Sequence, residues 1–286
     1  MNVAAFALEV SHLSKKYETF EAVSDLSFRV APGEILGLVG PNGAGKTTSL
    51  RTIAGVLPIQ DGTVRIAGID LATDEAHAKS RLSWVPDDPQ PFDSLTVEEH
   101  LEFTARLYQL GEDWRARADE LIETFELAEK REALGGELSR GMRQKLAYCC
   151  AWLPRPAVSL LDEPLSGLDP RGIRSAREAI REMARGGSAV ILSSHQLELI
   201  EALADRILII HRGRKVFEGT LLEARGALHN DVGTLEEIFL AITEGGGVIG
   251  GELAAGHASG AAPVDPRWGF VAPPSPSEPK APDAER

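Results

Sequence analysis

Short apolar segments alternate with helix-like segments along most of the chain. Between Ala22 and Val30, apolar and polar residues alternate as in a half-buried strand, and the run EILGLVG, residues 34–40, is typical of a fully buried one. Further buried strands are predicted at residues 82–85 (LSWV), 157–161 (AVSLL), 188–194 (SAVILSS) and 206–210 (RILII). This alternation predicts an α/β fold with a mainly parallel sheet that has helices on both faces.

The pattern becomes continuously helical between Leu95 and Leu153, where no convincing strand interrupts it. Thr96 and Glu99 form a capping-box pattern ahead of the run EEHLEFTARLYQL. We therefore expect an α-helical subdomain, about residues 88–155, inserted into the sheet domain.

The C-terminal residues differ in composition from the rest. From residue 245 onward, glycine, alanine and proline dominate, and this segment holds seven of the chain's 17 prolines. Such a segment cannot bury enough apolar surface to offset the entropy that is lost on ordering. We expect a main domain over residues 1–220, a helical extension over 221–244 and a disordered tail over 245–286. A docking motif at Trp268 and Phe270 is the alternative for the tail.

Composition and charge narrow the classes of protein. With 286 residues and 43% hydrophobic content, the chain can bury one large core or two small ones. A net charge of -13 argues against nucleic acid or an anionic membrane surface as a partner. The start MNVAAFALEV lacks the features of a signal peptide, and no apolar run reaches the roughly 18 residues of a membrane span. We expect a cytosolic protein, so that in any membrane process another chain must cross the bilayer.

The chain has two cysteines, Cys149 and Cys150, which are adjacent in sequence. Adjacent cysteines suit neither ordinary disulfide geometry nor the spacing of metal ligands. We therefore expect two buried thiols in a reduced compartment.

A glycine-rich stretch, VGPNGAGKTT at residues 39–48, follows the first buried strand. It meets the pattern G-x-x-x-x-G-K-[ST], in which glycines turn backbone N–H groups inward to hold phosphate oxygens. Lys46 adds a cation, and Thr47 offers a hydroxyl group to a magnesium ion. The candidate nucleotide-binding residues are Gly40, Pro41, Asn42, Gly43, Ala44, Gly45, Lys46, Thr47 and Thr48.

Two carboxylates, Asp162 and Glu163, come directly after the predicted strand AVSLL. The carboxyl ends of parallel strands are where ligands bind in open sheets. Asp162 could hold magnesium through water, and Glu163 could polarise the water that attacks a γ-phosphate. The alternative is a solvated pair that caps the following helix.

With these two motifs, the chain resembles the nucleotide-binding subunit of an ATP-binding cassette (ABC) transporter. Further matches in the family's order are Tyr17 (an aromatic residue against adenine), LSRGMRQKLA at residues 138–147 (the signature), SGLD at residues 166–169 (the D-loop) and His195 (the switch histidine). The resemblance implies a P-loop NTPase core with an antiparallel β subdomain beside the helical one. It also implies that ATP and Mg²⁺ bind between two copies of the chain.

The resemblance assigns roles to individual residues. The residues implied in catalysis are Lys46, Glu163 and His195. The residues implied at Mg²⁺ are Thr47, Asp87 and Asp162. The residues implied at the nucleotide, besides the glycine-rich loop, are Tyr17, Ser139, Gly141 and Asp169, the last three acting across to the second copy.

Several of these assignments have a purely structural alternative. Ser139 can merely cap its own helix, and Tyr17 can simply pack against a strand. A lone His195 can be an ordinary surface or core histidine. Asp169 can cap the helix that begins at Pro170, a role that does not exclude a contact with the second copy.

The chain departs from the family pattern at two places. Asp87 stands where the family has a glutamine, with Gln90 three residues later, and we take Asp87 as the functional position. Aspartate keeps an oxygen for metal but loses the amide donor and adds charge. In the signature, Arg140 replaces a glycine and Met142 a glutamine. Arg140 could support phosphate binding or point outward to solvent, which is the more frequent fate of arginine.

These departures, with the segment LEEIFL at residues 235–240, resemble the ATPase subunits of bacterial ABC-2-type exporters. The resemblance implies an ATP-hydrolysing subunit that couples closure of two copies to a separate membrane permease, from the inner face of the membrane. The alternatives are a soluble ABC ATPase that acts on DNA or ribosomes, and a nucleotide-binding regulator with little turnover.

Overall fold

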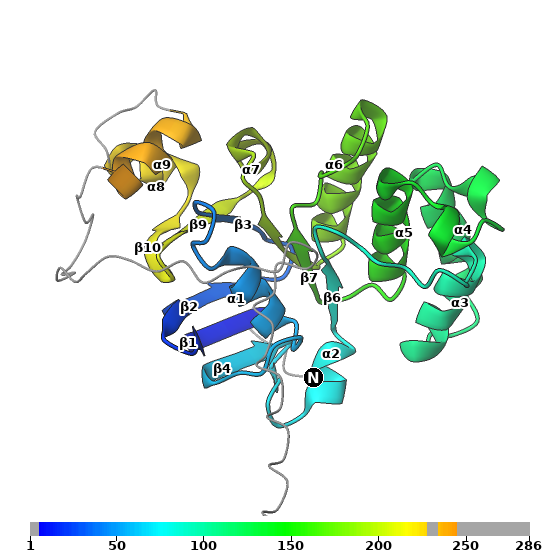
Figure 1. Cartoon of the computed structure of the whole chain (residues 1–286), viewed down its shortest axis with the longest axis horizontal. Coiled ribbons are helices and arrows are strands. Elements are labelled where there is room, and N and C mark those ends of the chain that lie inside the picture. The colour runs from blue at the N-terminus through cyan, green and yellow to red at the C-terminus, as the bar shows by residue number, and fades with distance from the viewer. Residues whose placement is uncertain (1–5, 228–233, 245–286) are drawn as a thin grey trace, which may run out of the picture. The chain divides into compact units, whose positions relative to one another are not determined.

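Buried apolar runs pair into a central sheet. In the computed structural model, which describes residues 6–227 and 234–244, its strand order is β10-β9-β3-β8-β7-β6 (Figure 1). The strands are β3 (Ile35–Val39), β6 (Leu82–Val85), β7 (Val158–Asp162), β8 (Ala189–Ser193), β9 (Arg206–His211) and β10 (Arg214–Gly219). All neighbours pair in parallel except β10, which runs antiparallel to β9 at the edge. The predicted mainly parallel sheet is confirmed.

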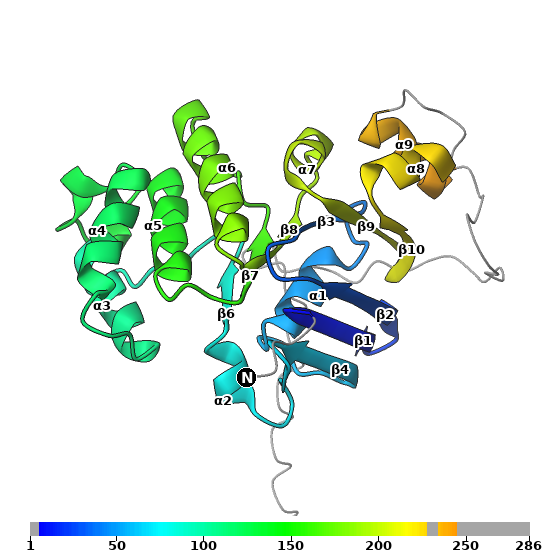
Figure 2. The same cartoon turned by 180° about the vertical axis from the view of Figure 1, so that it is seen from behind.

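The central sheet is covered on both faces because alternate residues of its strands face opposite ways. Ile35 and Val39 of β3 belong to one buried cluster, and Leu36 and Leu38 belong to another. The first cluster is shared with α6 (Pro170–Arg185) and α7 (Leu197–Leu203), and the second with α1 (Lys46–Ile53). Figure 2 shows the same two layers from behind.

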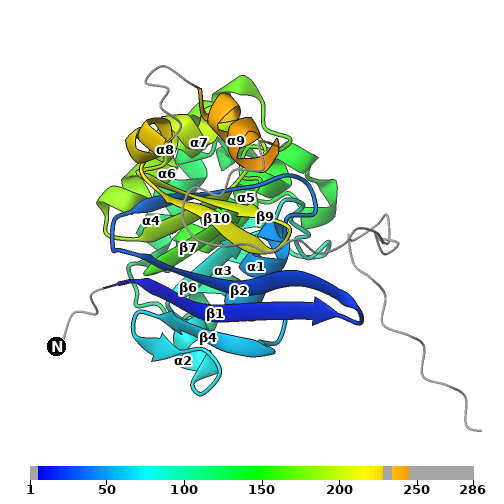
Figure 3. The same ribbon diagram turned by 90° about the vertical axis from the view of Figure 1, so that its left-hand side faces the viewer.

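A second, four-stranded sheet has the order β2-β1-β4-β5 and lies over α1 (Figure 3). Its strands are β1 (Leu8–Tyr17), β2 (Phe20–Val30), β4 (Asp61–Ile66) and β5 (Ile69–Asp70), and all pairs are antiparallel. This sheet is the antiparallel β subdomain that the family resemblance implied. The short helix α2 (Glu75–Lys79) follows it.

Helices dominate residues 95–153, as predicted. They are α3 (Val97–Leu107), α4 (Trp114–Thr124), α5 (Arg140–Trp152) and the 3₁₀ turns η1 (Ala128–Lys130) and η2 (Gly135–Glu137). The capping box is present: the Thr96 N–H donates to Glu99 Oε2 (2.7 Å), and the Glu99 N–H donates to Thr96 Oγ1 (3.1 Å). The limits of a subdomain at residues 88 and 155 stay a prediction.

Two helices, α8 (Leu221–Ala227) and α9 (Leu235–Glu244), follow β10. Leu235 is buried and Phe239 packs against the core, while the domain limit at residue 220 stays a prediction. The predicted tail, with Trp268 and Phe270, lies outside the described residues. None of the described helices has the length and hydropathy needed to traverse a lipid bilayer.

Both cysteines lie on α5 and are free thiols. Cys149 is buried, and its Sγ donates to the Leu121 carbonyl oxygen (3.6 Å). Cys150 is only half-buried, so the expectation of two buried thiols is wrong for this residue. The reason is that Cys150 faces a surface groove beside α5, whereas Cys149 faces the core.

Candidate active site

The glycine-rich loop joins β3 to α1 and is shaped by its backbone. Gly45 has a φ of 105°, a left-handed conformation that favours glycine, and a Cβ there would collide with the Ala22 carbonyl oxygen. At Gly40 a Cβ would collide with the Ile210 carbonyl oxygen, so β2 and β9 both pack directly on the loop. These close approaches explain why the loop needs glycine at both positions.

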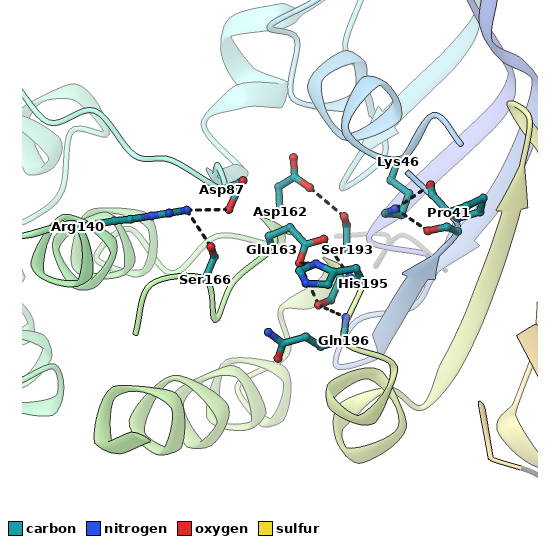
Figure 4. A network of polar contacts seen from close by, with 12 residues as sticks. Pro41, Lys46, Asp87, Arg140, Asp162, Glu163, Ser166, Ser193, His195 and Gln196 are labelled. Atoms are coloured by element: carbon teal, nitrogen blue, oxygen red, sulfur yellow. Dashed lines mark hydrogen bonds and ion pairs between the residues drawn. The ribbon is translucent and has the colours of Figure 1, made fainter. Parts of the chain in front are cut away.

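The loop opens the first turn of α1, which begins at Lys46. No side chain caps this helix, so the N–H groups of its first turn and the positive end of its dipole are available to an anion. The Lys46 side chain is buried, and its Nζ donates to the carbonyl oxygens of Gly40 (2.6 Å) and Pro41 (3.2 Å) (Figure 4). Burial lowers the pKa of Lys46, and the charges of Glu163 and Asp162 counteract that shift.

Asp162 ends β7 beside Ser193, which ends β8. Asp162 is 3% exposed, and its carboxylate accepts a hydrogen bond from Ser193 Oγ (2.9 Å). Burial raises the pKa of Asp162, and hydrogen bonds from Ser193 and Thr47 oppose the shift. Asp162 is therefore not a solvated residue, and it lies beside the hydroxyl group of the glycine-rich loop.

Glu163 turns away from the strand with a φ of 48°, in the left-handed region. Its Oε1 accepts from the His195 N–H (3.0 Å), and its Oε2 accepts from Ser194 Oγ (3.1 Å) and contacts His195 Nδ1 (2.8 Å). The following helix, α6, is capped by Asp169 instead. The alternative in which the acidic pair caps that helix is wrong.

The oxygen donors near Thr47 fit a magnesium ion that is shared with a phosphate ligand. Thr47 and Asp162 offer a hydroxyl and a carboxylate, the hard oxygen ligands that Mg²⁺ prefers. No group of three or more His, Cys, Asp or Glu side chains within residues 6–227 and 234–244 could hold a metal alone. Mg²⁺ typically takes one or two carboxylates together with substrate phosphates, which is the arrangement these residues allow.

An Asp162→Asn variant is expected to unfold at a higher temperature than wild type at pH 7 when no nucleotide is present. A raised pKa means that the native state binds the proton more tightly than the unfolded chain, so stability falls as pH rises from about 3.8 through the raised value. The increase in stability of the variant over wild type should be largest at neutral pH and should shrink in acid, where Asp162 of the wild type is protonated. Thermal unfolding from pH 4.5 to 8 measures this. A lower melting temperature at pH 7 would mean that the bonds to the carboxylate outweigh its burial.

The signature and D-loop residues lie at helix starts. Ser139 caps α5 by accepting from the Met142 N–H (3.3 Å), and Asp169 caps α6 by accepting from the Gly172 N–H (2.9 Å). Pro170 is the first residue of α6, as expected. The capping roles are confirmed, and the roles toward a second copy stay predictions.

Tyr17 ends β1 and pairs with Phe20 of β2 across a tight hairpin. Its half-buried ring lies 6.0 Å from Lys15 Nζ. Further along β2, Ala22 touches the glycine-rich loop, so the hairpin is on the loop's side of the molecule. Stacking of Tyr17 on a base stays a prediction.

The Arg140 side chain is half exposed but has two side-chain partners, so it does not simply extend into solvent. Its Nη2 donates to Ser166 Oγ (2.9 Å) and lies 3.6 Å from Asp87 Oδ1. Gln90 donates to Asp88 Oδ2 (2.8 Å). The choice of Asp87 over Gln90 as the functional position stays a prediction.

From the sequence, four residues are predicted at one edge of the central sheet, and Figure 4 shows them there: Lys46, Asp162, Glu163 and His195. The prediction did not include Ser193 and Ser194, whose hydroxyl groups hold Asp162 and Glu163. The available signal was the pair of serines directly before His195, at the end of a buried strand.

Comparisons with known proteins agree with this geometry. A family model described as ABC transporter matches residues 23–166, and one described as "AAA domain, putative AbiEii toxin, Type IV TA system" matches residues 135–201. The chain is 34% identical over 238 residues to the ABC-type transporter ATP-binding protein EcsA of Bacillus subtilis, covering 83% of this chain and 96% of that one. It is 36% identical over 221 residues to the Nod factor export ATP-binding protein I of Burkholderia thailandensis, covering 76% and 73%. A solved ATP-binding subunit of an ABC transporter matches with a TM-score of 0.80 and 33% identity, covering 82% of this chain and 99% of that one.

Proposed function

The chain belongs to the ABC transporter family as an ATP-binding subunit that hydrolyses ATP, and from this premise we propose that two copies bind MgATP between them and drive a separate permease. The observation that carries the proposal is the meeting of Lys46, Asp162, Glu163 and His195 at one edge of the central sheet. These groups provide a cation, a metal ligand, a base and a partner that orients the base.

Each residue has a role that follows from its contacts. The loop N–H groups and Lys46 would hold the β- and γ-phosphates. Mg²⁺, held by Thr47 and Asp162, would neutralise developing charge on the phosphate oxygens. Glu163 would accept a proton from the attacking water, and the bonds from Ser194 and His195 fix the direction of its carboxylate.

ATP would close two copies because it contacts both. The start of α5, with Ser139 and Gly141, would face the γ-phosphate held by the other copy, and Asp169 would reach the other glycine-rich loop. ADP lacks that bridging phosphate, so it has no differential affinity for the closed state. Hydrolysis would therefore reopen the pair.

A surface groove suits a helical segment of the permease. It has a volume of about 310 Å³, and its lining includes Trp84, Pro91, Phe92, Phe103, Tyr108 and Cys150. Phe92 and Phe103 are 57% and 47% exposed, and their rings meet edge to face at 5.6 Å. The loop that carries Asp87 forms one wall of the groove, so movement of this loop at the nucleotide site would displace a permease segment bound in the groove.

We further propose that the complex exports its substrate from the inner face of the membrane. A relative named for Nod factor export and the resemblance to ABC-2-type exporters support this direction. The substrate itself would be selected by the permease.

Co-expression with the permease tests the proposal. A Phe103→Asp variant is expected to co-purify with permease-containing membranes roughly tenfold less than wild type, since burial of a phenylalanine is worth about 1.5–3 kcal/mol. The matched control is Leu107→Asp on the same helix, 65% exposed and outside the groove lining. Equal losses in both variants would contradict the groove assignment. A wild-type chain found with ribosomes or DNA instead of membranes would favour the soluble alternative.

A further inference from the structure

Asp87 and Arg140 depart from the family pattern, and their side chains contact each other within one copy of the chain. Arg140 Nη2 lies 3.6 Å from Asp87 Oδ1 and donates to Ser166 Oγ at 2.9 Å (Figure 4). Asp87 follows β6, Arg140 begins α5 and Ser166 lies in the loop before α6. One guanidinium group therefore joins three segments that are distant in sequence.

The stem of Arg140 packs against the loop before α6. It lies across Gly167, where an added Cβ would come within 3.1 Å of Arg140 Cδ, and Gly167 has a φ of 76° that favours glycine. Beside it, a Cβ on Gly141 would lie 2.9 Å from the Gly167 carbonyl oxygen. The start of α5 thus sits directly on the loop before α6, and the stem of Arg140 lies against that loop.

Asp87 adds a third carboxylate near Asp162 and Glu163. Figure 4 shows Asp87 between Arg140 and Asp162, close enough for the charges of the two carboxylates to interact. The Asp87 and Arg140 side chains are 50% and 52% exposed, so their ion pair adds little to the stability of the fold. Its effect falls on the ligand, because an unneutralised carboxylate here would repel an anionic nucleotide.

We propose that Arg140 is a positioning residue: it keeps the Asp87 carboxylate paired and away from the nucleotide phosphates, and it ties the loop after β6 to α5 and Ser166. In this proposal Asp87 is paired with Arg140 and does not take the place at Mg²⁺ that the family resemblance implied. The inference rests on the proposed function, since it concerns MgATP at that site. The Asp87 loop also forms a wall of the groove, so the same guanidinium links the groove to the signature and the D-loop.

A double-mutant cycle on the full chain tests this inference. MgATP affinity is measured by calorimetry for wild type, Arg140→Gln, Asp87→Asn and the double variant. Arg140→Gln alone leaves Asp87 unpaired and should weaken binding roughly fivefold, the upper range for an exposed ion pair. The double variant should bind within about twofold of Asp87→Asn alone. Arg140→Lys keeps the charge and should bind nearly as wild type. The control is Arg174→Gln, which removes an exposed arginine from α6 and should change nothing.

The possible results distinguish a failure of the proposal for Arg140 from a failure of the proposed MgATP-binding function. If Arg140→Gln weakens binding equally with and without the change at Asp87, or not at all, the inference is wrong. A purely structural role predicts that melting temperature and affinity fall together, with no rescue in the double variant, and this result would also overturn it. A wild-type chain that binds no MgATP would instead overturn the proposed function before any variant is compared.

Discussion

A Glu163→Gln variant is expected to bind MgATP and to hydrolyse it roughly 10²–10⁴ times more slowly than wild type, the usual contribution of a general base. The amide is close in size to the carboxylate: its single oxygen can still accept the hydrogen bond from the His195 N–H, and its NH₂ group can donate to Ser194 Oγ, which donated to the carboxylate. Binding groups are kept while the base is lost, so ATP should close two copies that hydrolysis no longer reopens. Light scattering should show the mass doubling on addition of MgATP.

Two controls make this result specific. ADP should leave the variant monomeric, because it lacks the phosphate that both copies contact. Glu178→Gln, a matched change at an exposed position of α6, should leave turnover at the wild-type rate. Undiminished hydrolysis by Glu163→Gln would show that another group is the base. A variant that binds ATP and stays monomeric would show that the altered signature cannot close the pair alone, or that the chain is not a motor.

The central sheet could be predicted from the sequence because its strands are buried on both faces. Every residue of β3, β7 and β8 is buried, so each strand reads as a continuous apolar run. Asp162 and His195 were predictable for the same reason, since each follows directly on such a run. Burial of this kind leaves a strong local signal that needs no knowledge of tertiary contacts.

The antiparallel sheet left a weaker signal. Register shifts between Val10 and Leu13, and again beyond Leu13, interrupt the alternation of β1. In β4 only Val64 and Ile66 are buried, too few to set a period of two. Only part of β2 was therefore recognised from its pattern, and the sheet as a whole came from the family resemblance.

The contact between Arg140 and Asp87 could not be predicted from sequence. The two residues are 53 positions apart and meet only because α5 starts on the loop before α6, beside the end of β6. Each looked like an isolated departure from the pattern. Tertiary structure shows that the added cation and the added carboxylate are neighbours.

A Lys46→Met variant is expected to bind MgATP roughly 10- to 150-fold more weakly, since a hydrogen bond to a charged group is worth about 1.5–3 kcal/mol. Methionine has nearly the length of lysine but carries no charge. The phosphate therefore loses its cation, while the side-chain volume packed inside the loop is largely kept. Calorimetry of the purified full chain measures the affinity. Lys130→Met, a matched change at an exposed position, should bind as wild type.

Stability distinguishes a lost ligand contact from a damaged loop. Burial lowers the pKa of Lys46, so the native state binds this proton less tightly than the unfolded chain. Stability therefore rises as pH increases through the lowered value toward 10.5, and at neutral pH the buried charge is destabilising. Lys46→Met should accordingly melt no lower than wild type at pH 7, with any gain shrinking in alkali. If affinity and melting temperature fall together, the side chain supports the loop through its bonds to Gly40 and Pro41 more than it serves the phosphate.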